Sequence, residues 1–210
     1  MTMILSNGAI SPVHRDIIRA AKDGDVLFLR NLLNNEIPAK VLINALCYSV
    51  RNSHLPCCKL LLDNGANVDG VGLYGSTPLL TAVGRLNLEI ARMLLQRGAD
   101  VNARDEIGRT PLLVAILNIG DTGLLRLLLD DGADANMADS RGLPPLWAAM
   151  LENGNPDVLR LLLECGADAT VQYFGKNLLE IARKNGLKEF EQILEEYPCH
   201  CMTQLYQMTL

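Results

Sequence analysis

Several features that mark common functional classes are scarce in this sequence of 210 residues. Only 4% of the residues are aromatic, only three are histidines, and Lys and Arg never occur more than two in succession. The formal net charge is −5. An acidic chain without a basic cluster lacks the electrostatic footprint of a nucleic-acid-binding protein, so we expect no nucleic-acid partner.

Long apolar stretches are also missing. The first residues, MTMILSNGAISPVHRD, contain too short an apolar run for a secretory signal. No apolar stretch approaches the about 20 residues that a membrane-spanning helix needs. The six cysteines are therefore expected to be reduced thiols. We expect no membrane insertion and a cytoplasmic or nuclear location.

Catalytic patterns are weak as well. The three histidines, His14, His54 and His200, are spread over the chain. A repeating architecture would place them on different units, which makes a Cys–His or Ser–His–Asp constellation unfavourable. The many glycines do not form a phosphate-binding loop of the P-loop type. We therefore predict that the protein is not an enzyme and has no cofactor.

The cysteines are the candidates for metal or redox chemistry. Cys199-His200-Cys201 places three soft ligands side by side, but a closed zinc site needs four, commonly as spaced pairs. Cys57 and Cys58 are adjacent on a predicted helix and would point about 100° apart. We therefore predict no metal site. The alternative hypothesis is a metal- or redox-responsive protein that acts through these cysteines.

The most informative feature that is present is a ten-residue motif that occurs four times. The copies LLLDNGANVD, MLLQRGADVN, LLLDDGADAN and LLLECGADAT begin at Leu60, Met93, Leu127 and Leu161. Their glycines, at positions 65, 98, 132 and 166, follow one another at intervals of 33, 34 and 34 residues. A fixed interval of this length is the signature of a stacked repeat protein.

Each copy carries local signals for two short helices. Thr77 and Thr110 suit helix N-caps, and the prolines that follow them suit the first helical turn. The motif glycine suits a left-handed helix end, and the recurring Asp100 and Asp134 suit a loop-forming role. Helices of about 8 to 10 residues are not stable alone, so each unit must be buried by its neighbours.

The starts GSTPLLTAV (75–83) and GRTPLLVAI (108–116), together with the Gly-Ala-Asp-x-Asn ends, resemble ankyrin repeats, whose unit has about 33 residues. The resemblance covers residues 14–197. It implies an all-α solenoid of stacked helix-turn-helix units with β-hairpin-like finger loops. The expected units are 14–40, 41–74, 75–107, 108–141, 142–174 and 175–197, with terminal caps at both ends and tails at 1–13 and 198–210.

The chain departs from the family pattern at several points. Where the family usually has His after Thr-Pro-Leu, the residues here are Leu80, Leu113, Trp147 and Glu180. The hydrogen bonds of that histidine are therefore expected to be absent. Two units each carry one extra residue in the turn between their helices, near 120–123 and 153–155, and the loop 169–176 is one residue short. Glu195 replaces a leucine at the end of the last unit, as a terminal cap requires.

The resemblance also implies a function. Ankyrin-like stacks bind proteins through a concave face of finger loops and first helices, so we expect a non-enzymatic, monomeric interaction module. It would act as a scaffold, adaptor or inhibitor for one or more partner proteins. Exposed Tyr, Phe and Arg are residue types that anchor interfaces. The alternative for any single finger residue is a solvated loop position without a role. The expected contact residues are Tyr74, Arg104, Asp105, Glu106, Asp139, Arg141, Tyr173 and Phe174.

Two asparagines are candidate modification sites by resemblance. Asn102 and Asn136 lie at the loop position that is hydroxylated in many ankyrin proteins by an oxygen-sensing asparaginyl hydroxylase. Leu94 and Leu128 lie eight residues upstream of them, as in the hydroxylated sites of the ankyrin proteins that they resemble. The alternative is a structural role, in which the asparagine side chain stabilises the turn. This role would apply whether or not the residue is modified.

Overall fold

A computed structural model describes residues 11–34, 36–72, 75–118 and 122–197. The chain divides into two compact units, Met1–Ala103 and Arg104–Leu210, where the sequence predicts one continuous repeat domain. The division falls inside the expected unit 75–107, four residues before its end. The first helix begins at Pro12, two residues before the expected start of the repeat region.

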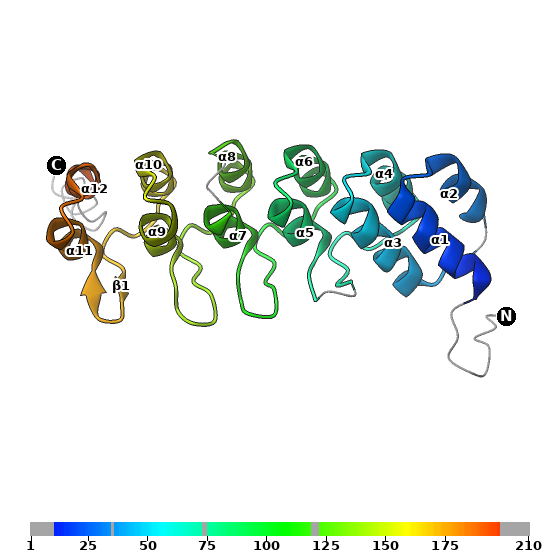
Figure 1. Cartoon of the computed structure of the whole chain (residues 1–210), viewed down its shortest axis with the longest axis horizontal. Helices are drawn as coiled ribbons and strands as arrows, with labels where there is room; N and C mark the ends of the chain where they lie inside the picture. The colour runs from blue at the N-terminus through cyan, green and yellow to red at the C-terminus, as the bar shows by residue number, and fades with distance from the viewer. Residues whose placement is uncertain (1–10, 35, 73–74, 119–121, 198–210) are drawn as a thin grey trace, which may run out of the picture. The chain divides into compact units, whose positions relative to one another are not determined.

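The first unit consists of three helix pairs (Figure 1). The first helices of successive pairs pack on each other, α1 on α3 and α3 on α5, and each also contacts the second helix of its own pair. The longest of them, α3, has 13 residues and exceeds the predicted helix length. The bounds are α1 (Pro12–Asp23), α2 (Val26–Leu32), α3 (Ala39–Arg51), α4 (Leu55–Asp63), α5 (Pro78–Gly84) and α6 (Leu88–Gln96).

The second unit repeats this arrangement and adds a short hairpin. First helix α7 packs on α9, and the second helices α8, α10 and α12 contact one another in that order. The fold is therefore all-α apart from one two-stranded sheet within the described residues. The bounds are α7 (Pro111–Leu117), α8 (Thr122–Asp130), α9 (Pro145–Ala148), α10 (Pro156–Glu164), β1 (Gln172–Tyr173), β2 (Lys176–Asn177), α11 (Leu178–Lys184) and α12 (Lys188–Glu196).

The predicted helix signals are confirmed. The hydroxyls of Thr77 and Thr110 accept hydrogen bonds from backbone N–H groups three residues later, at 3.3 Å in both cases. Pro78 and Pro111 follow them in the first helical turn. The motif glycines are left-handed, with φ between 83° and 88°. Each cap satisfies backbone groups that the helix itself leaves without partners.

The core is aliphatic and follows the helical period. In α8, Leu124, Leu125 and Leu128 are completely buried, whereas Arg126 and Asp130 face solvent. Burying one leucine side chain contributes about 1.5–3 kcal/mol, so a helix with one buried face gains its stability from the helices it covers. The short helices of each unit therefore depend on their neighbours, as the sequence predicts.

The extra residue of the fifth predicted unit is accommodated inside a helix. After only four α-helical residues, α9 continues as a π-helical turn, η1 (Ala149–Asn153), which ends at the left-handed Gly154. A π-helical turn takes up one additional residue without breaking the helix. The sequence predicts the insertion itself but places it in the turn after the helix.

The last residue of the ten-residue motif ties one repeat to the next. In the first unit, Asp69 Oδ1 accepts the N–H of Asp100 at 2.9 Å. In the second unit, Asn136 Oδ1 accepts the N–H of Asp168 at 2.8 Å, and its Nδ2 donates to the carbonyl of Gly166 at 3.0 Å. A polar side chain therefore fixes the spacing of adjacent repeats at their loop ends.

These inter-repeat bonds predict a measurable stability effect. Replacing Asn136 with Ala removes two hydrogen bonds between repeats, and we expect the free energy of unfolding to fall by about 1–2 kcal/mol. The control is Asn185→Ala, since that exposed residue follows α11, and a surface change of this kind costs no more than about 0.5 kcal/mol. Urea denaturation followed by circular dichroism measures both. Equal losses in the two variants would contradict the bridging role.

Candidate functional site

Four loops follow the helix pairs and carry the residues expected to contact a partner (Figure 1). We call them finger 1 (70–76), finger 2 (104–109), finger 3 (138–143) and finger 4 (171–177). Finger 1 belongs to the first unit and the other three to the second. In fingers 1 to 3, one N–H donates to a carbonyl four residues later, at 3.4, 3.1 and 3.2 Å. Finger 4 is the β1–β2 hairpin, so the hairpin-like form of these loops is confirmed.

A carboxylate at the base of fingers 2 and 3 holds each loop closed from the inside. Asp105 Oδ1 accepts the N–H groups of Ile107 and Arg109, and its Oδ2 accepts Arg109 Nε at 2.8 Å. In finger 3, Asp139 does the same, with the N–H groups of Arg141 and Leu143, both at 2.9 Å, as donors to Oδ1. Both aspartates are therefore part of the architecture of the loop.

Asp139 is held in its charged form. Burial by itself would raise the pKa of this carboxyl, but the N–H groups of Leu143 and Arg141 and the guanidinium of Arg141 outweigh burial and hold the pKa below its ordinary value. Only 5% of the residue is exposed. A partner could reach almost none of Asp139, so its sequence-based assignment to the contact surface gives way to a role inside finger 3.

Fingers 2 and 3 are bonded to each other. The guanidinium of Arg104 donates to the carbonyl of Ala138 at 3.1 Å, and the N–H of Ser140 donates to the carbonyl of Ile107 at 3.0 Å. Gly108 makes this approach feasible, because a Cβ there would collide with Ser140. The two loops therefore present one continuous surface, and Arg104 is used in part to build it.

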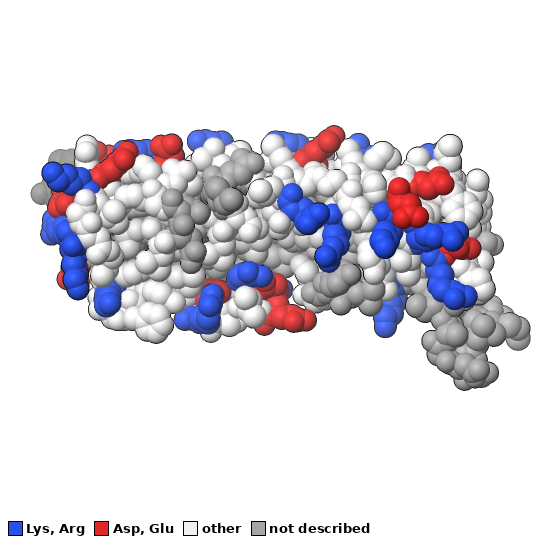
Figure 2. Space-filling model, viewed as in Figure 1, with Lys and Arg blue, Asp and Glu red and all other residues white. Residues whose placement is uncertain are grey.

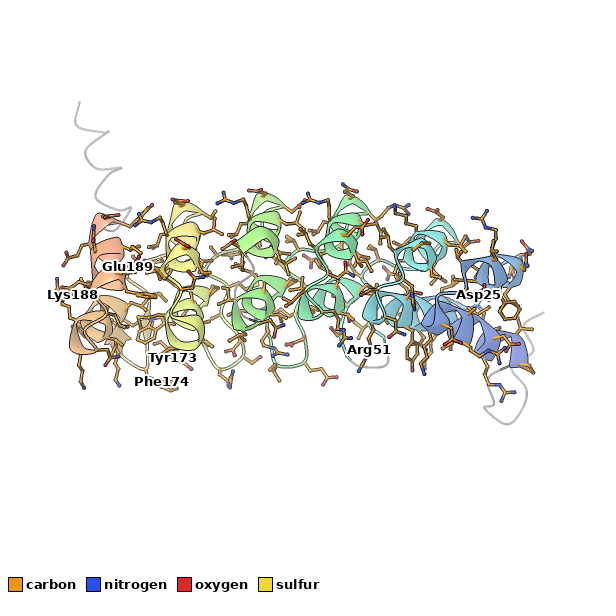
Figure 3. All side chains as sticks on the ribbon, turned by 45° about the horizontal axis from the view of Figure 1, so that its top comes forward. Asp25, Arg51, Tyr173, Phe174, Lys188 and Glu189 are labelled. Carbon is orange, nitrogen blue, oxygen red and sulfur yellow. The ribbon has the colours of Figure 1, made fainter. Side chains whose placement is uncertain are left out.

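An aromatic row leads from the core to the tip of finger 4. Trp147, in α9, is buried and donates its Nε1–H to the carbonyl of Val171 at 3.0 Å. Tyr173 lies against Trp147, with ring centroids 5.5 Å apart, and Phe174 lies against Tyr173 at 4.4 Å. Figure 3 shows Tyr173 and Phe174 at the loop side of the helices. The sequence predicts no hydrogen bond from this position, whereas Trp147 donates one to finger 4.

Phe174 stands out at the tip of this row. It is 81% exposed, and its φ of 51° lies in the left-handed region, which favours glycine and asparagine. Gly175 follows with φ of 67°, so the two residues form the left-handed pair typical of a two-residue hairpin turn. A bulky side chain in this conformation costs about 1–2 kcal/mol.

The remaining expected contact residues have different surroundings. Glu106 is exposed, and Arg141 keeps 68% of its side chain accessible while pairing with Asp139. Tyr74 lies outside the described residues. Ile107, which the sequence does not single out, is 47% exposed at the tip of finger 2. The sequence signal that could have identified it is an apolar residue that follows two acidic residues and precedes a glycine.

Charges of both signs are mixed over the fingers of the second unit (Figure 2). Lys or Arg and Asp or Glu side chains lie close together there, with uncharged surface between them. The surface therefore carries no uniform potential, and any partner would be selected by individual contacts rather than by net charge.

The two candidate modification sites differ in their surroundings. Asn136 is exposed, and its amide makes the two inter-repeat bonds described above. Asn102 is half-buried and donates its N–H to Asp100 Oδ1 at 2.9 Å. The Asn136 side chain thus bonds to the next repeat rather than within its own turn, and hydroxylation of Asn102 and Asn136 stays a prediction.

The cysteines of the first unit are poorly suited to redox chemistry. Cys57 and Cys58 are completely buried. Burial raises the pKa of both thiols, that of Cys58 to about 12, which suppresses the reactive thiolate at neutral pH. No three His, Cys, Asp or Glu side chains gather into a metal-binding cluster in the described ranges. The segment Cys199–Cys201 lies outside those ranges.

Comparison with protein-family models agrees with the repeat geometry. A family model described as ankyrin repeats (3 copies) matches residues 17–105 and again residues 112–204, well over half of the chain. No curated protein matches the sequence. Among the described residues, no helix is both long enough and apolar enough to cross a membrane.

The closed form of finger 3 predicts an acid-dependent stability term. Because the folded-state pKa of Asp139 lies below its unfolded value of about 3.9, its contribution is complete above that pH and is lost as the pH falls through the folded pKa. At neutral pH we expect Asp139→Asn to lower the free energy of unfolding by about 1–3 kcal/mol.

Urea denaturation from pH 7 down to pH 2.5 measures this term. The gap between wild type and Asp139→Asn should shrink below about pH 4, when the wild-type carboxyl is itself neutral. The exposed Asp131→Asn provides a control with the same change in charge, expected to stay within about 0.5 kcal/mol of wild type. A gap that does not change with pH would refute the role of the Asp139 charge.

Proposed function

Because the chain belongs to the ankyrin-repeat family, we propose that fingers 2, 3 and 4 form the binding surface for a partner protein. Ankyrin repeats are generally protein–protein interaction modules, and the family is typically non-enzymatic. In this proposal the protein acts in the cytoplasm or nucleus as a scaffold, adaptor or inhibitor. The function resides in the finger tips, where side chains are not committed to packing between repeats.

The observation that carries the proposal is the position of Phe174. Folding leaves this side chain 81% exposed, so the about 1.5–3 kcal/mol that burial of a large apolar side chain provides is not gained. Its left-handed backbone adds strain that asparagine or glycine would avoid. A partner with an apolar pocket would gain the burial energy, which gives this costly residue a physical purpose.

The surroundings of Phe174 hold it ready for such a contact. Its ring rests on Tyr173, which rests on the buried Trp147, so part of its rotational freedom is already lost before a partner arrives. Because ordering a side chain on binding costs about 0.5–1.5 kcal/mol, this support favours association. Preorganisation of this kind is the mechanism that we propose for the module.

Fingers 2 and 3 supply the other contacts. Their mutual hydrogen bonds fix Ile107 and Arg141 at the tips, an apolar contact and a guanidinium. Arg141 directs its Nε and one terminal nitrogen toward Asp139, and a guanidinium has five N–H donors, so donors remain for a partner. The complementary surface would thus have an apolar pocket for Phe174 and acceptor oxygens opposite Arg141.

Replacing Phe174 with Asn separates binding from stability. Asn-Gly is the preferred sequence for a two-residue hairpin turn, so the relief of strain should offset the lost ring contact and leave the melting temperature equal or higher. Loss of an interface anchor of this size costs about 2 kcal/mol or more, at least a tenfold weaker complex. The partner is first captured from an extract of the source cells, and its affinity for both proteins is then measured with purified components.

The matched control is Leu27→Asn. Leu27 is 72% exposed on α2 of the first unit, so this variant also removes a large exposed apolar side chain, but from a helix rather than from a finger. We expect it to retain wild-type affinity. Wild-type affinity of Phe174→Asn would contradict the proposal, as would equal losses in the two variants.

A further inference from the structure

Asparagine directly precedes glycine at two turns whose side chains the structure describes. These are Asn64-Gly65, which follows α4 in the first unit, and Asn185-Gly186, which joins α11 to α12 in the second. Glycine has no side chain to hinder its backbone nitrogen, so that nitrogen can attack the asparagine before it. Both asparagines are exposed to water. Each is therefore a candidate for spontaneous deamidation.

Deamidation at such a step is an intramolecular reaction followed by hydrolysis. The glycine nitrogen forms a bond to Cγ of the asparagine, and the Cγ–Nδ2 bond breaks. Nδ2 leaves as ammonia and takes up the proton that the glycine nitrogen loses. Water then opens the five-membered imide. Cleavage of the new N–Cγ bond gives aspartate, whereas cleavage of the original peptide C–N bond gives isoaspartate, which has one additional methylene in the backbone.

The two turns share a backbone conformation that prevents the attack. The ψ angle is 20° at Asn64 and 0° at Asn185, and in both turns the glycine N–H donates to the carbonyl three residues earlier at 3.1 Å. Ring closure requires the glycine nitrogen and the asparagine Cβ to lie on the same side of the Cα–C bond, and ψ near 0° holds them apart. Either turn must therefore open locally before it can react.

The two asparagine side chains are held differently. Asn64 Nδ2 donates to the carbonyl of Leu60 at 2.8 Å, which fixes the amide against the end of its own helix. The side chain of Asn185 makes no hydrogen bond to any residue in the described ranges. Asn64 must therefore give up a hydrogen bond before its Cγ can be attacked, whereas Asn185 need not, and a bond that has to be broken lowers the population of the reactive conformer.

The surroundings of the two turns also differ in burial. From residue 183 to residue 189 no residue is buried. By contrast, Leu61 and Ala66 lie within three residues of Asn64 and are buried, and the N–H of Ala66 donates to the carbonyl of Leu61 at 3.0 Å. A segment with few buried contacts opens at a lower free-energy cost. Local opening is therefore easier at Asn185.

We propose that Asn185 is a site at which the folded protein deamidates spontaneously, whereas the fold protects Asn64. The isoaspartate product would lengthen the backbone of the short turn between α11 and α12. Two bonds span that point: the N–H of Gly186 donates to the carbonyl of Arg183 at 3.1 Å, and that of Leu187 to the carbonyl of Ala182 at 2.9 Å. An additional backbone atom changes their register, so the modification loosens the attachment of α12.

Site-resolved kinetics test the proposal. The full chain is kept folded at pH 8 and 37 °C, and peptide mapping by mass spectrometry follows deamidation of Asn64 and Asn185 with time. We expect conversion at Asn185 to be at least fivefold faster than at Asn64. It should also be faster at pH 8 than at pH 6.5, because the attacking nitrogen must lose its proton. Equal rates at the two sites, or no conversion at Asn185, would overturn the proposal.

The same chain unfolded in 8 M urea provides the control for local sequence. Without the turns, both steps have glycine as the following residue and no fixed structure, so the ratio of the two rates should fall toward one. A ratio as large in urea as in the folded protein would show that neighbouring residues set the preference, and it would refute protection by the fold.

Asn185→Asp separates the charge of the product from the change in its backbone. This variant carries the same negative charge as deamidated protein but has a normal peptide link. Hydrogen exchange of the α12 amides should be faster in the isoaspartate fraction purified from aged protein than in Asn185→Asp. Equal exchange in the two would refute the loosening of α12. Phe174→Asn should deamidate at the wild-type rate, because the finger surface is a separate hypothesis with its own experiment.

Discussion

Helices of seven to nine residues cannot persist alone in water, and this constraint governs most of the structure. Each such helix is held by burial of one aliphatic face against the next helix pair. The loop ends need a second device, because they contain little apolar surface. Asp69 and Asn136 provide it by accepting a backbone N–H of the following repeat. Packing of the helices and polar bridging of the loops together fix the spacing at which the fingers project.

In the fingers, polar side chains again hold the backbone in place. Asp105 and Asp139 direct their carboxylates inward and satisfy the loop backbone, so these charges stabilise shape. The side chains left at the tips are different in kind: Ile107, Arg141 and Phe174. The apolar side chains of Ile107 and Phe174 form no hydrogen bond that closes a loop, whereas Arg141 pairs with Asp139 and still keeps 68% of its side chain accessible. Phe174 is held at an energetic cost. The carboxylates hold the loops closed, and the apolar and cationic side chains stand at the tips. This division favours the interpretation of the tips as a binding surface.

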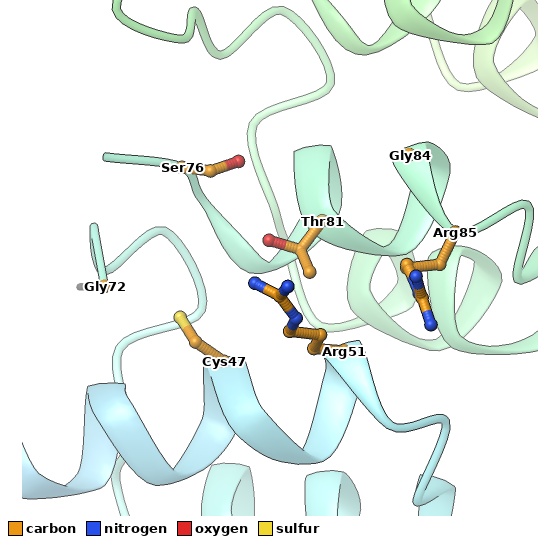
Figure 4. Close-up of a pocket in the computed structure, with 7 residues that line it drawn as sticks. All are labelled: Cys47, Arg51, Gly72, Ser76, Thr81, Gly84 and Arg85. Carbon is orange, nitrogen blue, oxygen red and sulfur yellow. The ribbon is translucent and has the colours of Figure 1, made fainter. Parts of the chain in front are cut away.

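The repeat fold could be predicted in detail because its determinants are local. Thr77 and Thr110 cap helices, the motif glycines end them, and the 33- and 34-residue intervals set the period. The site was harder to predict because its determinants are not local. From the sequence, Asp139 is expected to be an exposed charged residue in a loop. In the structure it is buried and accepts hydrogen bonds from N–H groups of its own turn. Trp147 stands where the family usually has histidine, and the sequence predicts only the loss of the histidine hydrogen bonds, yet the indole donates a hydrogen bond to finger 4. In the first unit, the close approach of Gly72 to Cys47 (Figure 4) also depends on tertiary packing, which spacing in the sequence does not reveal.

Site-specific photo-crosslinking tests whether the finger tips of the second unit contact a partner protein. A benzophenone-bearing phenylalanine analogue at position 174 keeps an aromatic ring in place, and the same analogue at position 27 marks an exposed apolar site on α2 of the first unit. Irradiation in source cells should give a discrete adduct with one partner from position 174 and none from position 27. The absence of an adduct at position 174, or the same adducts at both positions, would contradict a partner-binding surface at these finger tips.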